Sequence, residues 1–186
     1  MRVFTALYPS LAAVADLELA VGSLRSANPD LTWTRSEQWH LTLTFHADLD
    51  TDQVRRLERT VARCAAIRDA TSARFRGGGA FPSRTRGRTL WVGVEPVDQR
   101  LADLQRNLTA RLRREGWPLE DRRYRPHLTV ARSRVRRDLG ALVDELDAYS
   151  GPSWQVDRIA IVVSRPDDEG RFAHERIGDY PLRRDV

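Results

Sequence analysis

The sequence predicts an α+β protein with a bilobal, internally duplicated fold, in which two antiparallel β-sheets face each other across a central cleft and the helices lie outside. The segment WHLTLTF at 39–45 returns 87 positions later as PHLTVAR at 126–132. Alternating polar and apolar residues in both copies are typical of half-buried strands. Both halves also follow one order: strand, helix, short strand, histidine strand, helix, strand. We expect one bilobal domain over residues 1–186, with approximate halves 1–82 and 83–186; exchange of strands between the lobes is left open.

The first half contains helices with recognisable start and stop signals. Ser10 is the expected N-cap of a helix that ends at Asn28-Pro29, and Asp50 or Thr51 is expected to cap the next one. The expected elements are a strand at 2–8, a helix from 10 to 28, an extended piece at 31–34, a strand at 39–45, a helix at 51–67, a strand at 73–75 and a flexible glycine turn at 77–79.

The second half repeats this order and adds a tail. Gly116-Trp117-Pro118 ends its first helix, much as Asn28-Pro29 ends the counterpart. The expected elements are a strand at 89–94, a helix at 97–115, a strand at 126–132, a helix at 139–146, a long strand at 156–163 and a tail strand at 171–180 that pairs with it as a hairpin.

The two histidine strands present matching polar faces. Strand alternation places His40, Thr42 and Thr44 on one face, and Leu41, Leu43 and Phe45 on the other. In the second copy His127 and Thr129 share a face, while Leu128 and Val130 enter the core. Core packing explains a repeated Leu and Val, but it gives no reason for the same imidazole and hydroxyl to return on the polar side. The repeat therefore indicates chemistry in the cleft.

All basic side chains of the chain are arginine. The sequence contains 31 Lys plus Arg and no Lys, so a Walker phosphate loop, a Schiff-base lysine and a lysyl-adenylate ligase are excluded. Coding bias explains the choice of Arg over Lys. The net charge of +5 and the pI of about 10.2 still favour a polyanionic partner, since Arg pairs with phosphate through a bidentate fork.

The remaining composition indicates a cytoplasmic protein. No apolar run approaches the ~20 residues that a membrane helix needs, and the first residues lack the features of a signal peptide. The single cysteine, Cys64, lies on the apolar stripe of a predicted helix and is expected to be buried. We expect a monomer without membrane contact.

Two imidazoles converging on one cleft would supply an acid and a base near neutral pH. Metal binding is the alternative use of two histidines. It is less favoured because a catalytic metal site usually has a third protein ligand, and neither strand offers a nearby carboxylate or thiolate on its polar face. Thr hydroxyls can donate to phosphate oxygens, and the many arginines suit an anion. This combination predicts hydrolysis of a strained phosphodiester without a metal or other cofactor.

The segments His40-Leu41-Thr42-Leu43 and His127-Leu128-Thr129-Val130 resemble the paired His-x-Thr-x motifs of the two-histidine phosphoesterase superfamily. Within it the chain is similar to the RNA 2',3'-cyclic phosphodiesterases, also called 2'-5' RNA ligases. Segments 2–7, 79–82, 90–93 and 124–132 fit that family as well. The resemblance implies a bilobal fold and metal-independent opening of a terminal 2',3'-cyclic phosphate to a 2'-phosphate and a 3'-hydroxyl. It also implies that His40 is the proton donor, that His127 is the proton acceptor, and that Thr42 and Thr129 hold the phosphate.

Further substrate contacts are expected around the motifs. Arg132 would contact the phosphate or lie solvated at a strand end. Phe45 would stack on a base, although strand parity favours the core for it. Tyr124 and Arg125, with Arg122 and Arg123, form the best candidate for gripping RNA. The expected partners are RNA ends or nucleotides with a 2',3'-cyclic phosphate.

The last two histidines and the direction of the reaction leave alternatives. His46 is expected at the surface, and His174 lies in the tail strand with no motif around it. The same acid and base could serve 2'-5' RNA ligation or hydrolysis of 2'-5' linked oligonucleotides. A basic RNA-binding module without turnover is the alternative from another class of protein.

Overall fold

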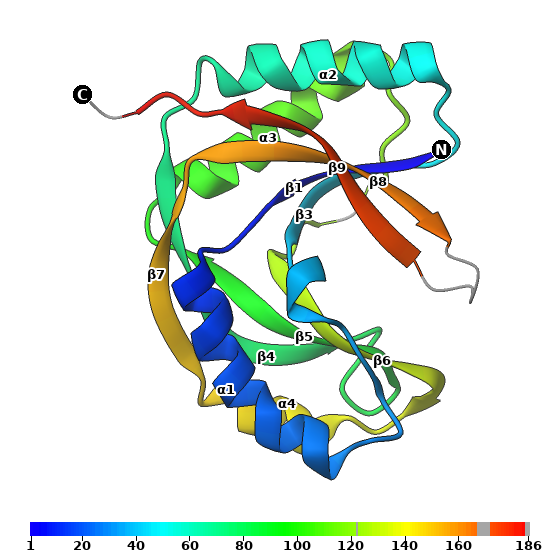
Figure 1. Ribbon diagram of the computed structural model, residues 1–186, viewed down its shortest axis with the longest axis vertical. Helices are drawn as coiled ribbons and strands as arrows, with labels where there is room; N and C mark the ends of the chain where they lie inside the picture. Colours follow the sequence, from blue (N-terminus) through cyan, green and yellow to red (C-terminus); the bar gives the residue numbers. More distant parts are fainter. Residues whose placement is uncertain (122, 167–171, 185–186) are drawn as a thin grey trace.

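In the computed structural model, which describes residues 1–121, 123–166 and 172–184, the chain forms two antiparallel sheets with helices around them (Figure 1). This α+β architecture confirms the predicted fold class. The first sheet has the strand order β3 (Leu41–His46), β1 (Arg2–Leu7), β8 (Arg158–Pro166) and β9 (Phe172–Pro181). The second sheet has the order β2 (Thr32–Trp33), β6 (His127–Arg137), β5 (Gly87–Pro96), β4 (Thr71–Phe81) and β7 (Ser150–Val156). No helix in these described ranges is both long and apolar enough to cross a membrane.

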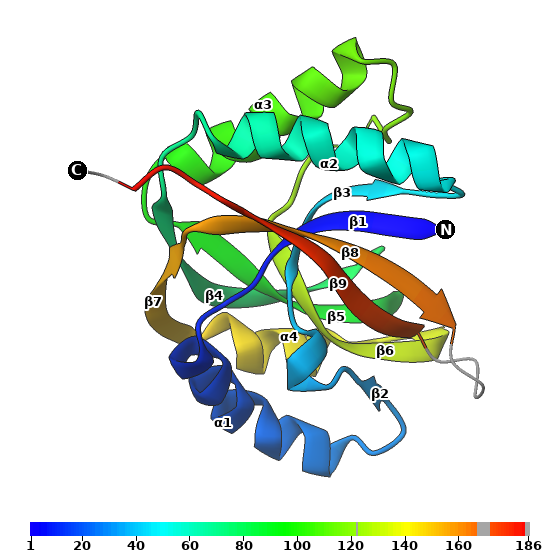
Figure 2. The ribbon, with the colours of Figure 1, turned by 45° about the horizontal axis from the view of Figure 1, so that its top comes forward.

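Both sheets contain strands from the two predicted halves of the chain. In the first sheet β1 pairs with β3 on one side and with β8 on the other. In the second sheet β4 lies between β5 and β7. The strand predicted over 156–163 corresponds to β8, except that Val156 ends β7. Because β7 belongs to the second sheet and β8 to the first, the chain passes from one sheet to the other at this point (Figure 2).

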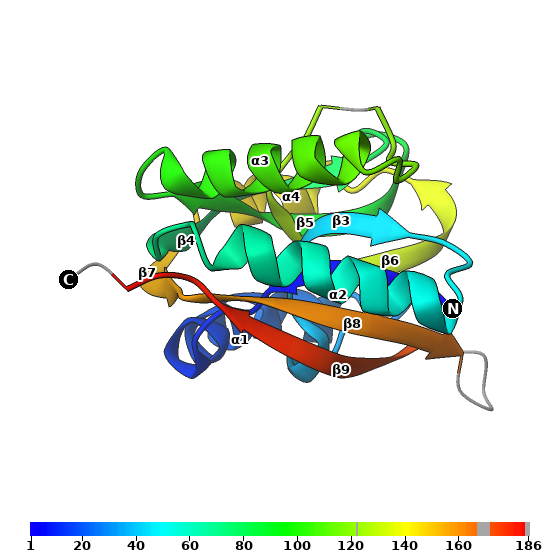
Figure 3. The same cartoon turned by 90° about the horizontal axis from the view of Figure 1, so that it is seen from above.

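The α-helices among the described residues begin and end near the predicted signals. They are α1 (Leu11–Ala27), α2 (Thr51–Ala65), α3 (Arg100–Arg114) and α4 (Gly140–Asp147). The Ser10 side chain accepts a hydrogen bond from the backbone N–H of Ala13, and Asp50 forms a capping box with Gln53. Helix α2 packs on β8 and β9 of the first sheet (Figure 3), whereas the contacts of α1 and α4 are with the second sheet. Cys64 of α2 is buried, as predicted.

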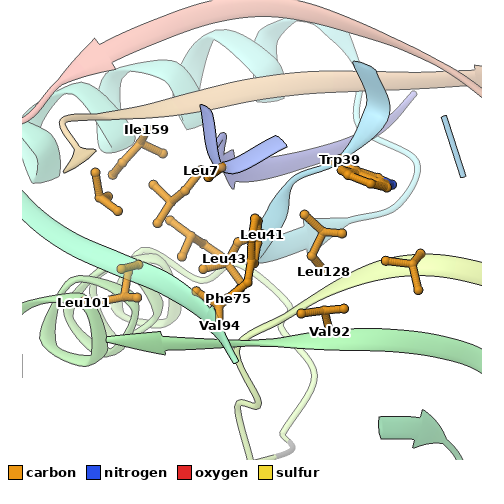
Figure 4. Packing of buried hydrophobic residues seen from close by; sticks show 14 of the residues in the cluster. Leu7, Trp39, Leu41, Leu43, Phe75, Val92, Val94, Leu101, Leu128 and Ile159 are labelled. Carbon is orange, nitrogen blue, oxygen red and sulfur yellow. The ribbon is translucent and has the colours of Figure 1, made fainter. Parts of the chain in front are cut away.

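The main hydrophobic core joins the two sheets and α3. Leu41 and Leu43 of β3 pack in the same cluster as Leu128 of β6, Val94 of β5 and Leu101 of α3 (Figure 4). The apolar sides of the two histidine strands therefore contribute to one core. Their polar sides are held in place by the same packing.

Each histidine strand contains a β-bulge directly after the Thr of its motif. In β3, Thr42 pairs with Ala6 and Thr44 with Thr5, so Leu43 is the extra residue. In β6, Thr129 pairs with Trp91 and Ala131 with Leu90, so the extra residue is Val130. An extra residue moves every later side chain to the opposite face of the sheet. The duplication therefore extends to an irregularity of the backbone.

The bulge in β3 overturns the predicted faces of three residues. Phe45 was assigned to the core by strand parity, but it is 49% exposed and pairs with Phe4. Thr44 and His46 were assigned to the polar face and the surface, but they are buried, at 6% and 3% exposure. The Thr44 hydroxyl contacts the Thr5 hydroxyl at 2.8 Å and Nε2 of His46 at 3.0 Å. Local alternation could not predict this exchange, because the bulge reverses the parity after Leu43.

The predicted glycine turn is part of a strand. Residues 77–79 lie within β4 and pair in part with β5. A Cβ atom on Gly79 would lie 2.1 Å from the indole Cζ2 of Trp91, so only glycine leaves room for that ring. The prediction of a flexible turn was wrong because the glycines accommodate a neighbouring side chain.

Candidate active site

The two motif histidines are oriented by the same backbone contact. Nδ1 of His40 lies 2.6 Å from the carbonyl oxygen of Gln38, and Nδ1 of His127 lies 2.6 Å from that of Arg125. A carbonyl oxygen can only accept a hydrogen bond, so Nδ1 carries the proton in both rings. Nε2 is then the nitrogen that accepts or donates a proton during a reaction. Each imidazole is anchored by the carbonyl two residues before it, which makes the pair equivalent in tautomer as well as in sequence.

His174 contacts the His40 ring, and Arg132 and His127 lie close enough for their charges to act on it. Burial lowers the pKa of His40 to about 4, and the hydrogen bond to the Gln38 carbonyl opposes this change. The charges of His174, Arg132 and His127 lower the same pKa further. The structure therefore brings the two motif histidines within electrostatic range of each other, and His40 is neutral in the free protein at pH 7.

The motif threonines lie on the same faces as their histidines. Thr42 is half-buried and pairs with Ala6 of β1, whose neighbours Phe4 and Tyr8 contact the His40 ring. Thr129 is half-buried and pairs with Trp91, which contacts the His127 ring. Each hydroxyl is a possible side-chain donor two residues along the chain from its imidazole.

Aromatic rings enclose both imidazoles. The His40 ring stacks on Phe4 with centroids 4.6 Å apart and meets the edge of His174 at 5.3 Å. The His127 ring meets Phe81 edge-on at 4.9 Å and lies 5.8 Å from Trp91. These contacts restrict ring rotation and remove water from the imidazoles, which is the physical cause of the lowered pKa at His40.

Sequence reasoning gave no role to several of these neighbours. The assignment missed Phe4, Phe81, Trp91 and His174. A signal existed in the alternation of β9, which places His174 and Arg176 on one face. However, β9 reaches the site because its predicted hairpin partner β8 also pairs with β1, the strand that carries Phe4. This pairing of β1 with β8 is a long-range contact, which no local pattern indicates.

The two bulges bring Arg132 and Phe45 to the faces that carry the motif threonines. The two residues hold equivalent positions, five after His127 and five after His40. Arg132 pairs with Thr89 and donates a hydrogen bond of 3.3 Å to its hydroxyl. The charge of Arg132 lowers the pKa of both His174 and His40. Both residues are thus placed beside the site, although their contact with a substrate stays a prediction.

The residues predicted to bind RNA before the second motif differ in their exposure. Tyr124 is half-buried, and its hydroxyl donates a 3.0 Å hydrogen bond to the carbonyl of Thr42. Burial raises the pKa of this phenol well above its usual range. Tyr124 therefore connects the two motifs. The side chains of Arg123 and Arg125 are exposed, and Arg122 lies outside the described residues.

The fold and the paired motifs define a two-histidine phosphoesterase. More particularly, the chain belongs to the 2'-5' RNA ligase superfamily, whose model matches residues 13–168. It is 32% identical over 142 residues to the RNA 2',3'-cyclic phosphodiesterase of Methanothermobacter thermautotrophicus, covering 75% of this chain and 76% of the relative. These findings confirm the resemblance stated from the motifs.

Solved structures confirm the fold. A protein of Thermus thermophilus superposes with a TM-score of 0.75 at 24% identity over the whole of both chains. Escherichia coli LigT complexed with 3'-AMP also gives a TM-score of 0.75, at 17% identity over 97% of each chain. At these identities the likeness concerns the architecture alone.

Proposed function

We propose that this protein hydrolyses the 2',3'-cyclic phosphate at the end of an RNA to a 2'-phosphate and a 3'-hydroxyl. The observation that carries the proposal is the equivalent anchoring of His40 and His127 through Nδ1, at one site where their charges interact. This arrangement supplies two Nε2 atoms for proton transfer. The name of the relative from Methanothermobacter thermautotrophicus supports the choice of substrate.

The proposed reaction transfers two protons and breaks one P–O bond. Nε2 of His127 accepts a proton from a water molecule, whose oxygen attacks phosphorus in line with the 3'-oxygen. Nε2 of His40 donates a proton to that leaving oxygen. The hydroxyls of Thr42 and Thr129 donate to the non-bridging oxygens, and Arg132 balances their charge. The positions of these groups provide most of the rate enhancement, because phosphoryl transfer depends mainly on alignment and charge stabilisation.

The protonation of His40 must change when the substrate binds. With a pKa of about 4 the free ring is neutral at pH 7 and has no proton on Nε2 to donate. A phosphate anion beside the ring favours the imidazolium form, because an opposite charge at close range raises a histidine pKa. Substrate binding therefore supplies Nε2 of His40 with the proton that it later donates, and the uncharged ring in the free protein avoids repulsion with Arg132.

The test uses an RNA oligonucleotide with a 2',3'-cyclic phosphate end, incubated with purified protein in the presence of EDTA. Phosphorus NMR separates the cyclic diester from a 2'-phosphate and a 3'-phosphate. We expect a 2'-phosphate as the only product, and no turnover in a variant that carries both His40→Ala and His127→Ala. A 3'-phosphate product, or full activity in the double variant, would contradict the proposal.

The description of the matching family favours a second candidate, the joining of RNA ends by a 2'-5' linkage. This reaction is the same ring opening with an RNA 5'-hydroxyl in place of water: the 5'-oxygen bonds to phosphorus, the bond to the 3'-oxygen breaks, and the same base and acid serve it. Incubation of a cyclic-phosphate RNA with a 5'-hydroxyl RNA tests it. A ligated product resistant to a nuclease specific for 3'-5' linkages would support the second reaction.

A further inference from the structure

A hollow of about 590 Å³ lies beside the histidine site, and residues of β1, β7, β8 and β9 line it. Two residues that line the hollow also belong to the side of the first sheet on which His40 packs. Tyr8 and Ala160 line the hollow and also pack with Phe4, the residue that stacks on the His40 ring. Its volume falls within the roughly 300–1,000 Å³ of small-molecule sites. The hollow is therefore large enough for one further unit of a substrate held at the histidines.

The boundary between the hollow and the histidine site is a stacked pair. The guanidinium carbon of Arg176 lies 4.0 Å from the ring centroid of Tyr8, and that ring lies 6.0 Å from the ring of His40. Arg176 follows His174 by two residues on β9, so both side chains are on one face. Tyr8 covers one side of the guanidinium group, and the Arg176 side chain, which lines the hollow, is still 40% exposed.

The charges in the hollow are balanced. Arg158 contacts both carboxylate oxygens of Asp157 at 2.9 and 3.0 Å, and Arg176 lies 3.4 Å from Asp179. All four residues line the hollow, so its two cations face two anions. A balanced set fits a neutral nucleoside better than a free phosphate. A guanidinium plane stacks on nucleobases, and carboxylates accept hydrogen bonds from ribose hydroxyls and base amino groups.

We propose that this hollow binds the nucleoside that precedes the terminal, cyclic-phosphate-bearing nucleotide, with its base stacked on the outer side of the Arg176 guanidinium. The inference rests on the proposed function and names the form of its substrate. Binding of the preceding nucleoside makes the protein selective for the end of an RNA chain over a cyclic mononucleotide, which has no such nucleoside.

The experiment compares kcat/KM for three substrates. They are a 2',3'-cyclic mononucleotide, a dinucleotide with a 2',3'-cyclic phosphate end, and the same dinucleotide without its first base. We expect the wild-type protein to prefer the complete dinucleotide by roughly 5- to 150-fold, the range of one base-stacking contact. Arg176→Ala should remove this preference and leave the rate on the mononucleotide unchanged. Arg176→Lys should behave like Arg176→Ala, because lysine keeps the charge and loses the plane.

The control is Arg55→Ala in α2, which also removes one arginine charge but lies outside the hollow. It should keep the preference for the dinucleotide. Equal loss on all three substrates in Arg176→Ala, restoration of the preference by Arg176→Lys, or a wild-type protein indifferent to the first base would each overturn the assignment. Failure of the wild-type protein to hydrolyse any of the three would instead overturn the proposed function, and this assignment with it.

Discussion

The hydroxyl of Tyr124 donates a hydrogen bond to the backbone carbonyl of Thr42, across 82 positions of the chain. Tyr124 lies three residues before His127, and Thr42 two residues after His40. The bond therefore joins the segment that leads into the second motif to the strand of the first. A reaction that needs two imidazoles on one phosphorus atom depends on their relative position, and this contact is part of what sets it.

Tyr124→Phe should lower both stability and turnover. The change leaves the Thr42 carbonyl without this donor, which costs about 1–3 kcal/mol for a buried acceptor. Urea denaturation would measure the loss, and kcat with a cyclic-phosphate RNA should fall as the motifs move apart. Tyr149→Phe is the matched control, since the Tyr149 hydroxyl donates to Asp16. It should lower stability without lowering kcat. Equal kcat in the two variants would exclude a positioning role for Tyr124.

His46 should make the protein less stable in mild acid. Burial lowers its pKa to about 4, below the 6.5 of an unfolded histidine, so the unfolded chain binds the proton more tightly. The contribution is fully present above pH 6.5 and is lost as the pH falls from 6.5 towards 4. For one such group, the free energy of unfolding falls by about 2 kcal/mol when the pH is lowered from 7 to 5. His46→Gln should reduce the measured pH dependence by that amount; an unchanged dependence would show that His46 does not contribute to it.

His40 should take up a proton when an anion binds. In the free protein NMR titration of the His40 ring should give a pKa of about 4. Saturation with a 2'-nucleotide product should raise it, because the phosphate stabilises the imidazolium form. His46 serves as an internal reference, since its ring contacts Thr44 and Trp117 on the other face of β3. A His40 pKa that does not respond to the product would contradict the acid role proposed for this ring.

Arg132→Ala should weaken substrate binding more than Arg134→Ala. Both side chains are exposed on β6, but only the charge of Arg132 acts on His40 and His174. Loss of one charge-assisted hydrogen bond corresponds to about 1.5–3 kcal/mol, so KM should rise by about tenfold or more. The pKa of His40 should also rise, because a neighbouring positive charge is gone. If the two variants had the same KM, Arg132 would be an ordinary strand-end arginine.

The sequence predicted the elements of the fold well because their signals are local. Helix caps such as Ser10 and Asp50 and the alternation of the histidine strands act within a few residues. The paired motifs also indicated which residues to expect at the site. His40 and His127 are recognisable since an imidazole and a hydroxyl recur on the polar side of two strands, where core packing gives no reason for them.

The errors arose where a non-local feature overrides a local pattern. The bulges after Thr42 and Thr129 reverse the strand faces, yet any aliphatic residue can occupy the bulge position. This reversal buries His46 and exposes Phe45. Likewise, His174 meets His40 because β8, the hairpin partner of β9, also pairs with the distant strand β1, which carries Phe4. Neither the bulge nor the pairing of β1 with β8 is indicated by the neighbouring residues.

We propose that His40 and His127 act together on a single phosphate. Single-turnover rates with a cyclic-phosphate RNA, measured for the wild-type protein, His40→Ala, His127→Ala and the double variant, test this most directly. We expect each single change to lower the rate by about 100- to 10,000-fold. The double variant should then be hardly slower than either, because the two groups work as a unit. Losses that multiply in the double variant, or a single variant that keeps the wild-type rate, would contradict the claim.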